Sequence, residues 1–194
     1  VLAGSAFAER GVDPKATEFL WRNLRKSLFD STRMTVYGAS RKVGRSLREL
    51  EQAWHFRYED LGKNSMSDTY GFNVLLPRLG EVAPRLFEQQ SLFAELNPDD
   101  TVLDWFGDVT SAVNEENRDS QLLDSDILGQ FANYRNLTRN GISQVSIGTR
   151  RYEASGRLIL TDNLGEKAQS LVIENPESKR TRLVGVLDKV AFLD

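Results

Sequence analysis

The main change in the spacing of apolar residues falls at Gly141, and this change constrains the fold more than any other feature. Before Gly141, apolar side chains such as Leu20 and Leu24 recur every three to four residues, which is typical of amphipathic helices. After it, Val145 and Ile147 alternate with polar residues, which is typical of a half-buried strand. A run of helices followed by strands indicates an α+β fold. We expect a mainly helical N-terminal part and a small antiparallel β-rich C-terminal unit containing one helix.

This change predicts a mainly helical domain over 1–140, with one or two short strands, and a β-β-α-β unit over 141–194 packed on it. The expected helices cover about 14–29, 40–61, 98–114, 124–139 and 161–173. The expected strands cover 34–37, 70–76, 145–147, 157–160 and one or two segments within 183–192. The chain ends inside an apolar, strand-like run, so a C-terminal truncation of a longer protein is one alternative.

The composition removes several classes of chemistry. The chain has no cysteine and a single histidine, His55, so thiolate sites and clusters of imidazole ligands cannot form within it. We therefore expect no catalytic residues, no metal site and no cofactor. Acidic residues crowd 99–126, but Asp100, Asp104, Asp108 and Glu115 fall on one stripe, which we interpret as the solvated side of a helix. No apolar run approaches the ~18 residues of a membrane span, and we expect a cytoplasmic location.

The string GASRKVG, residues 38–44, is the one motif that suggests a cofactor. It resembles the glycine-rich turn of short-chain dehydrogenases in five residues: Gly38, Ala39, Ser40, Arg41 and Gly44. In that family a strand, the turn and a helix N-terminus hold a pyrophosphate, so the resemblance implies a nucleotide-dependent enzyme. Lys42 stands where the family has its middle glycine, and none of the five tyrosines has a lysine four residues later. A degenerate nucleotide site at 38–44 therefore remains one alternative.

Basic residues are concentrated near the N-terminus although the whole chain carries a net charge of −3. Residues 14–48 hold nine Lys or Arg against two acidic residues, Glu18 and Asp30. Two predicted helices would expose six of these cations, which are our candidate anion- or partner-binding residues: Arg22, Arg25, Lys26, Arg41, Arg45 and Arg48. They lie opposite the apolar stripes, where soluble helices ordinarily carry charge, and we expect acidic residues of 99–126 to neutralise part of them.

These observations favour a non-catalytic interaction or regulatory module, either alone or as part of a longer protein, with a protein as its partner. Nucleic-acid binding through the basic helix face of 22–48 is the alternative, and the isoelectric point of about 5.4 weighs against it. The two alternatives predict different behaviour, because nucleic-acid binding weakens steeply with salt.

Overall fold

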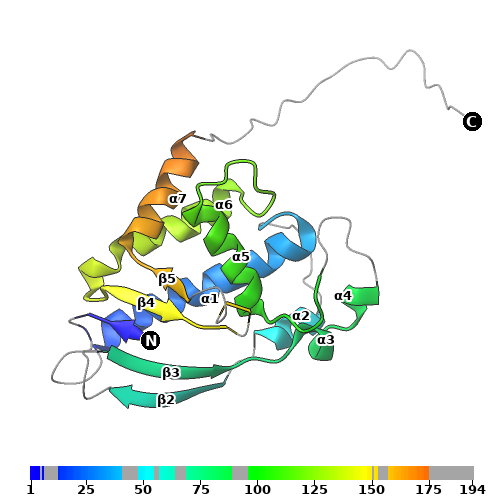
Figure 1. The fold of residues 1–194 in the computed structure, drawn as a ribbon, viewed down its shortest axis with the longest axis horizontal. Coiled ribbons are helices and arrows are strands. Elements are labelled where there is room, and N and C mark those ends of the chain that lie inside the picture. Colours follow the sequence, from blue (N-terminus) through cyan, green and yellow to red (C-terminus); the bar gives the residue numbers. More distant parts are fainter. Residues whose placement is uncertain are drawn as a thin grey trace, which may run out of the picture.

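The chain folds into a five-stranded antiparallel sheet with helices packed against it (Figure 1). The structure is a computed structural model. It describes residues 1–4, 6, 13–40, 48–54, 57–63, 69–88, 96–149, 151–152 and 157–174. The strands are β1 Leu2–Ala3, β2 Arg57–Lys63, β3 Thr69–Leu75, β4 Gln144–Ile147 and β5 Leu158–Leu160. The α-helices are α1 Pro14–Tyr37, α2 Arg48–Ala53, α3 Leu79–Val82, α4 Arg85–Glu88, α5 Val102–Asn114, α6 Ser125–Phe131 and α7 Asp162–Glu174. The 3₁₀ helices η2 Ala132–Asn136 and η3 Thr138–Asn140 follow α6.

The sheet joins strands from both sides of residue 140. Its order is β2-β3-β1-β4-β5, so the two-residue strand β1 lies between β3 and β4. Leu2 pairs with Tyr70 on one side and with Val145 on the other. These residues and Leu160, which pairs with Val145, therefore share one face of the sheet. The α+β class is confirmed, and the division into units over 1–140 and 141–194 stays a prediction.

Helix α1 is longer than the sequence pattern indicated. Asp13 caps its start by accepting a hydrogen bond from the Lys15 backbone N–H over 2.8 Å, and Pro14 occupies the first turn, as expected. The end at about residue 29 was wrong, because the helix continues to Tyr37. Gly38 ends it at φ 66°, a conformation that glycine adopts without strain. Residues 34–37 are therefore helical rather than a strand, with Met34 buried.

The helix expected over 40–61 is the largest correction to the predicted elements. Residues 48–53 form α2, but 57–63 form β2, which pairs antiparallel with β3. Trp54 and Tyr58 are four residues apart, a spacing that fits a helix and also two alternate positions of a strand. Pairing with β3 decides between the two, since cross-strand partners stabilise the extended form. Gly62, at φ 73°, follows an irregular step in that pairing rather than ending a helix.

The remaining elements agree with the expected order. The strand near 70–76 and the antiparallel pairing of 145–147 with 158–160 are confirmed, as is the helix that follows Thr161. The helix expected from residue 98 begins at Val102, because Thr101 and Asp104 form a capping box there. The helix expected over 124–139 is α6 followed by two 3₁₀ helices, and it ends at Gly141. The strands expected within 183–192 lie outside the described residues.

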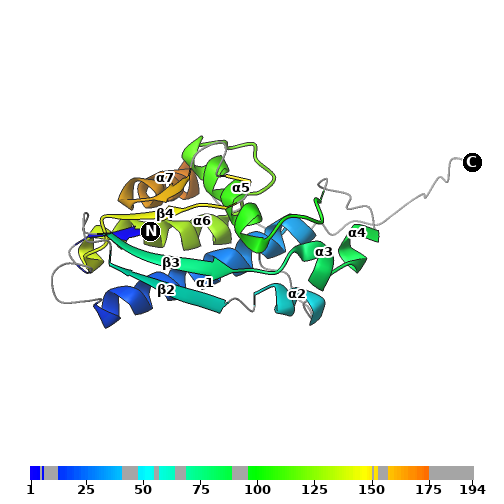
Figure 2. The ribbon, with the colours of Figure 1, turned by 60° about the horizontal axis from the view of Figure 1, so that its bottom comes forward.

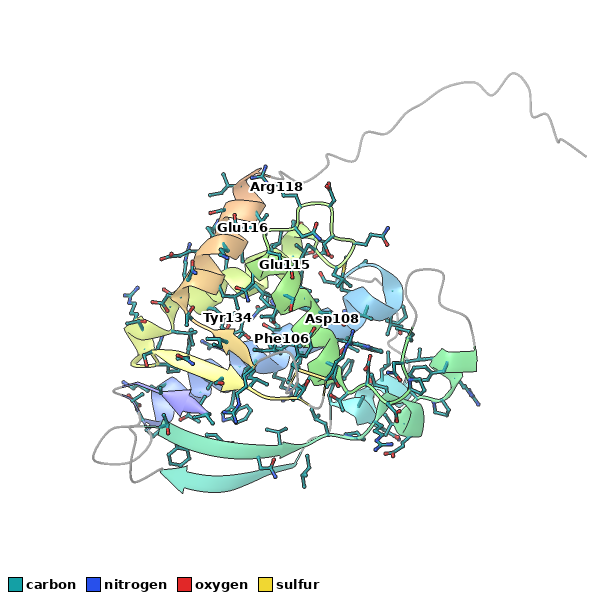
Figure 3. All side chains as sticks on the ribbon, viewed as in Figure 1. Phe106, Asp108, Glu115, Glu116, Arg118 and Tyr134 are labelled. Atoms are coloured by element: carbon teal, nitrogen blue, oxygen red, sulfur yellow. The ribbon has the colours of Figure 1, made fainter. Side chains whose placement is uncertain are left out.

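The core lies between α1, α5, α6 and η2. The rings of Phe106 and Phe131 stack with centroids 5.5 Å apart, and Phe131 meets Tyr134 edge-on at 5.7 Å. Tyr134 is fully buried, and its hydroxyl donates to Ser27 Oγ over 3.0 Å, which satisfies the polar atom. Figure 3 shows Phe106 and Tyr134 in the interior of the fold. None of the described helices combines the length and the apolar composition that a membrane crossing requires.

Helix α1 is central to this arrangement. It packs against both α5 and α6, and α7 packs on α6 and η2. The turned view shows α1 running alongside β2 and β3, with α7 farther from these strands (Figure 2). One side of α1 therefore faces the core along most of its length, and the opposite side is available to solvent.

Two helical glycines provide a matched test of the packing between α7 and η2. A Cβ on Gly165 would overlap the backbone nitrogen of Arg135, so Gly165→Ala should lower the free energy of unfolding by about 1–3 kcal/mol. A Cβ on Gly129, in α6, would meet nothing within 4 Å, so Gly129→Ala should raise it by up to about 1 kcal/mol. Urea denaturation of both variants measures the two values. Equal effects would contradict the close approach of α7 to η2.

Candidate functional site

Helix α1 carries a groove of about 650 Å³ on its solvent-facing side, which we call the α1 groove. Its described lining consists of Glu18, Trp21, Arg22, Arg25, Lys26, Phe29, Asp30 and Trp54. All except Trp54 come from α1, where positions three or four apart lie on the same side of the helix. Leu20, Leu24 and Leu28 are buried on the other side. The leucine face thus sets which residues the helix exposes.

The apolar floor of the α1 groove is held by contacts to the rest of the fold. The ring centroids of Phe29 and Trp54 are 4.5 Å apart, and Trp54 Nε1 donates to Thr32 Oγ1 over 3.3 Å. The Arg33 guanidinium lies 5.3 Å from the centroid of the Phe29 ring. The floor is therefore positioned before any ligand binds, which reduces the entropy cost of binding.

Trp21 fixes the other end of the floor. Its ring meets Phe72 of β3 edge-on, with centroids 5.8 Å apart. Such an aromatic contact adds roughly 0.5–1.5 kcal/mol beyond the area it buries. The α1 groove therefore has one aromatic anchor at the sheet and another at Trp54.

The rim of the α1 groove is basic. Arg22, Arg25 and Lys26 are all exposed. None of the three forms an ion pair with another described residue, including the acidic residues described between 99 and 126. Neutralisation by that acidic segment, which we expected, is therefore not seen for these three cations. The charge of Arg22 and Arg25 is available to a ligand in the groove, and Lys26 interacts electrostatically with Asp30.

Asp30 lies at one end of the α1 groove with a strongly perturbed carboxyl group. Burial raises the pKa of Asp30 from 3.8 to about 6. The nearby cations of Lys26 and Arg33 act to lower this pKa, whereas the carboxylates of Asp124 and Asp126 act to raise it. Near pH 6 about half of the Asp30 carboxyl groups are therefore protonated, which makes the net charge of the groove more positive.

The structure brings together half of the candidate residues that the sequence indicated. Arg22, Arg25 and Lys26 share the α1 groove. Arg41 and Arg45 lie outside the described residues, and Arg48 begins α2 with a side chain that is also outside them. The convergence of all six on one surface stays a prediction.

The aromatic floor was missed by the sequence analysis. Trp21 and Phe29 are eight residues apart with Arg25 midway, so a stripe of period four runs along this side of α1. That signal was present in the sequence. The contribution of Trp54 had no local signal, because it depends on the path of the chain between α1 and α2.

The acidic stripe of α5 corrects our interpretation of a solvated helix face. Asp104 is only 3% exposed and Asp100 only 7%, whereas Glu115 is exposed as expected. Figure 3 shows Asp108 on α5 itself, with Glu115 at the far end of the helix. Asp104 accepts hydrogen bonds from the Thr101 backbone N–H and hydroxyl, both over 2.8 Å. The C-terminal end of the stripe, at Glu115, is exposed to solvent, whereas Asp100 and Asp104 at its N-terminal end are buried.

The residues that cover the buried carboxylates are Thr149, Arg151 and Tyr152. Thr149 donates to Asp104 over 2.6 Å, and the Tyr152 hydroxyl donates to Asp108 over 2.6 Å. The Arg151 guanidinium contacts Asp108 at 3.1 Å and reaches Asp100 at 3.3 Å. Burial, and after it the hydrogen bond to Asp108, raise the pKa of the Tyr152 hydroxyl to about 12. These groups connect the three residues to α5, and every carboxylate among them has a partner.

The glycine-rich turn does not have the setting that phosphate binding requires. Residues 34–37 before it are the last turn of α1 rather than a strand, and Gly38 is the C-cap. Ser40 donates through its backbone N–H and its hydroxyl to the two oxygens of Asp124, both over 2.8 Å. Arg41 and Gly44 lie outside the described residues. The described half of the turn thus joins α1 to α6.

Within the described ranges, no three His, Asp or Glu side chains are grouped so as to hold a metal ion. His55 lies outside those ranges. The described lining of the α1 groove is cationic and aromatic, with two carboxylates, Glu18 and Asp30.

Comparison with known proteins adds no further constraint. A scan against protein-family models and searches of curated proteins and of solved structures found no match.

The covered carboxylate on α5 can be tested by truncation. Asp104→Ala removes the capping box and leaves the buried Thr149 hydroxyl without its acceptor, so it should cost about 2–4 kcal/mol of unfolding free energy. Asp99→Ala is the matched control, since Asp99 is exposed and its side-chain ion pair among the described residues is with Arg78 at the surface. It should cost less than about 1 kcal/mol. Similar losses in thermal and urea unfolding would show that the stripe is solvated throughout.

The raised pKa of Asp30 predicts a pH dependence of stability. Above pH 6 the ionised carboxyl is disfavoured in the folded state, so Asp30→Asn should be more stable than the wild type at pH 8. As the pH falls from about 6 toward 3.8, the folded wild type binds a proton that the unfolded chain does not, and the difference should shrink. Urea unfolding at pH 8, 6.5 and 5 measures this trend. A constant difference would contradict the burial of Asp30.

Proposed function

We propose that this chain is a non-catalytic interaction module that binds an acidic protein segment in the α1 groove. The observation that carries the proposal is the combination of three exposed cations, Arg22, Arg25 and Lys26, with a fixed aromatic floor. Cations without ion-pair partners among the described residues favour an anionic ligand, and the floor favours one that also carries a large apolar side chain. We further propose the cytoplasm as its location, in keeping with a chain that needs no disulfides.

The size and charge of the groove favour a peptide over a polynucleotide. A hollow of about 650 Å³ lies in the range of roughly 300–1,000 Å³ that holds one compact ligand or one anchor residue. Glu18 and Asp30 stand at the same surface and would repel closely spaced phosphates. A peptide can place its carboxylates near the three cations and its apolar residue between Trp21 and Phe29. The two acidic groups thus select for a ligand with spaced charges.

Nucleic acid is the second candidate, because aromatic and basic side chains alternate along the α1 groove. Aromatic rings interleaved with Arg22 and Arg25 could stack bases while the cations contact phosphates. The two candidates differ in their salt dependence, because each phosphate neutralised on a single strand contributes about 0.7 to the log–log slope. A peptide anchored by an apolar residue keeps more of its affinity at high salt.

The proposal predicts loss of peptide binding on charge reversal. A fluorescent peptide rich in Asp and Glu with one central Trp should bind in fluorescence anisotropy. Arg22→Glu combined with Arg25→Glu should raise its Kd at least about tenfold, because both cations become repulsive. Arg139→Glu, an exposed arginine on η3, is the matched control and should leave the Kd within about twofold.

Three outcomes would count against the proposal. The peptide fails to bind, or the control variant weakens binding as much as the double variant. In the third, a mixed-sequence single-stranded oligonucleotide binds more tightly than the peptide, which would favour the second candidate. The melting temperature of the double variant should match the wild type, since both arginines are exposed.

A further inference from the structure

The α1 residues that line the α1 groove form two neighbouring rows along the helix. The first row consists of Glu18, Arg22, Lys26 and Asp30, and the second of Trp21, Arg25 and Phe29. Successive members of a row are four residues apart, so they stand on the same side of the helix with Cβ atoms about 5–6 Å apart. Rows of this kind are the ridges by which one helix packs against another, whose own side chains enter the furrow between them.

The first row has a definite order of charge. A carboxylate stands at each end, Glu18 and Asp30, and the cations of Arg22 and Lys26 stand between them. From end to end the row covers about 18 Å of the helix axis. The pKa of Asp30 is raised by burial only to about 6, so this carboxyl is mostly ionised at pH 7.5 and the order of charge is kept. A ligand that complements the whole row must carry negative charge at its centre and positive charge toward both ends.

The first row does not complement a second copy of itself. Two copies of α1 laid antiparallel with their rows aligned would set Glu18 against Asp30 and would also set Arg22 against Lys26. Both are pairs of like charge, which cost affinity across an interface. A shift of one copy by four residues would set Arg22 against Arg22 or Lys26 against Lys26 at the centre. The order of charge therefore favours a partner other than a second copy of this chain.

The main chain of a ligand also needs hydrogen-bond partners when it binds. The described lining of the α1 groove comes from α1 and Trp54, so no described strand edge contributes to it. Extended peptides commonly gain affinity from main-chain hydrogen bonds to such an edge. The main chain of α1 cannot replace it, because its N–H and C=O groups are bonded within the helix. An α-helical ligand satisfies its own main chain, so it loses the fewest hydrogen bonds at this surface.

We infer that the α1 groove binds an amphipathic α-helix of a partner protein, which lies along α1 with acidic residues at its centre and a basic residue toward each end. This inference rests on the proposed function, since it specifies the conformation and the charge order of the acidic segment. The central acidic residues face Arg22, Arg25 and Lys26, and the outer basic residues face the two carboxylates of the first row. An apolar side chain of the ligand helix enters between Trp21 and Phe29.

The first test compares three short peptides by fluorescence anisotropy with the whole chain at pH 7.5. The matched peptide carries Lys, Glu, Glu and Lys at intervals of four residues in an alanine-rich helix, with a third Glu to face Arg25 and one Leu. The exchanged peptide swaps the Lys and Glu residues of that series, so its composition and net charge are unchanged. The proline peptide replaces a central alanine by Pro, which breaks a helix. The last two should bind at least about tenfold more weakly than the matched peptide.

The conformation of the bound peptide is measured directly by NMR. The Cα resonances of a ¹³C-labelled matched peptide should move to the values of an α-helix when the unlabelled protein is added. A bound peptide whose Cα resonances stay at the values of an unfolded chain would overturn the inference.

Glu18→Lys separates the order of charge from the total charge. The change makes the α1 groove more positive, so a flexible peptide rich in Asp and Glu should bind more tightly. The matched peptide should instead bind at least about threefold more weakly, because one of its lysines then faces a lysine. Glu166→Lys, at an exposed position of α7, is the control and should leave both Kd values within about twofold. Tighter binding of the matched peptide to Glu18→Lys would contradict the order of charge.

The outcomes distinguish this inference from the proposed function. If the flexible acidic peptide binds, and the matched, exchanged and proline peptides bind equally well, the helical ligand is overturned and the proposed function stands. If none of the acidic peptides binds, both are overturned. A dimer of the wild type in analytical ultracentrifugation that the matched peptide dissociates would place a second copy in the α1 groove, and this too would overturn the inference.

Discussion

The burial of the leucine face of α1 is the interaction on which the rest of this structure depends. Leu20, Leu24 and Leu28 face the core, and burying each such side chain contributes roughly 1.5–3 kcal/mol. Once this face is buried, α1 cannot rotate about its own axis without exposing the three leucines. Arg22 and Arg25 must then face solvent, and Trp21 must stand at the border between the interior and the α1 groove. The binding surface is thus a consequence of the core.

One carboxylate connects the end of α1 with the start of α6. Asp124 accepts hydrogen bonds from Ser40 and from the Ile127 backbone N–H, so it caps α6 while fixing the turn after Gly38. The same negative charge acts to raise the pKa of Asp30. The electrostatics of the α1 groove are therefore linked to how the two helices are joined, although Asp124 does not line the groove.

The sequence predicts those parts of the fold and site that depend on local signals. The start of α1 followed from its capping residues, and Arg22 and Arg25 were placed on one exposed side by helical periodicity alone. The extension of α1 past Phe29 and the strand after Trp54 could not be predicted in this way. Both depend on contacts with distant segments, which override local preference. The α1 groove was half predictable for the same reason, since its floor includes Trp54, which comes from another segment.

The position of β1 has a consequence for how the chain reaches its native state. Leu2 pairs with both Tyr70 and Val145, so a segment that precedes both of its partners in the chain fills the middle of the sheet. That place is complete only after β4 has been synthesised. Until then β3 has a bare edge, and β1 has only one of its two neighbours. Closure of so long a loop is entropically costly and slows folding. Helices α1, α5 and α6 all precede β4, and α1 packs on both of the others, so these helices can associate before the sheet closes.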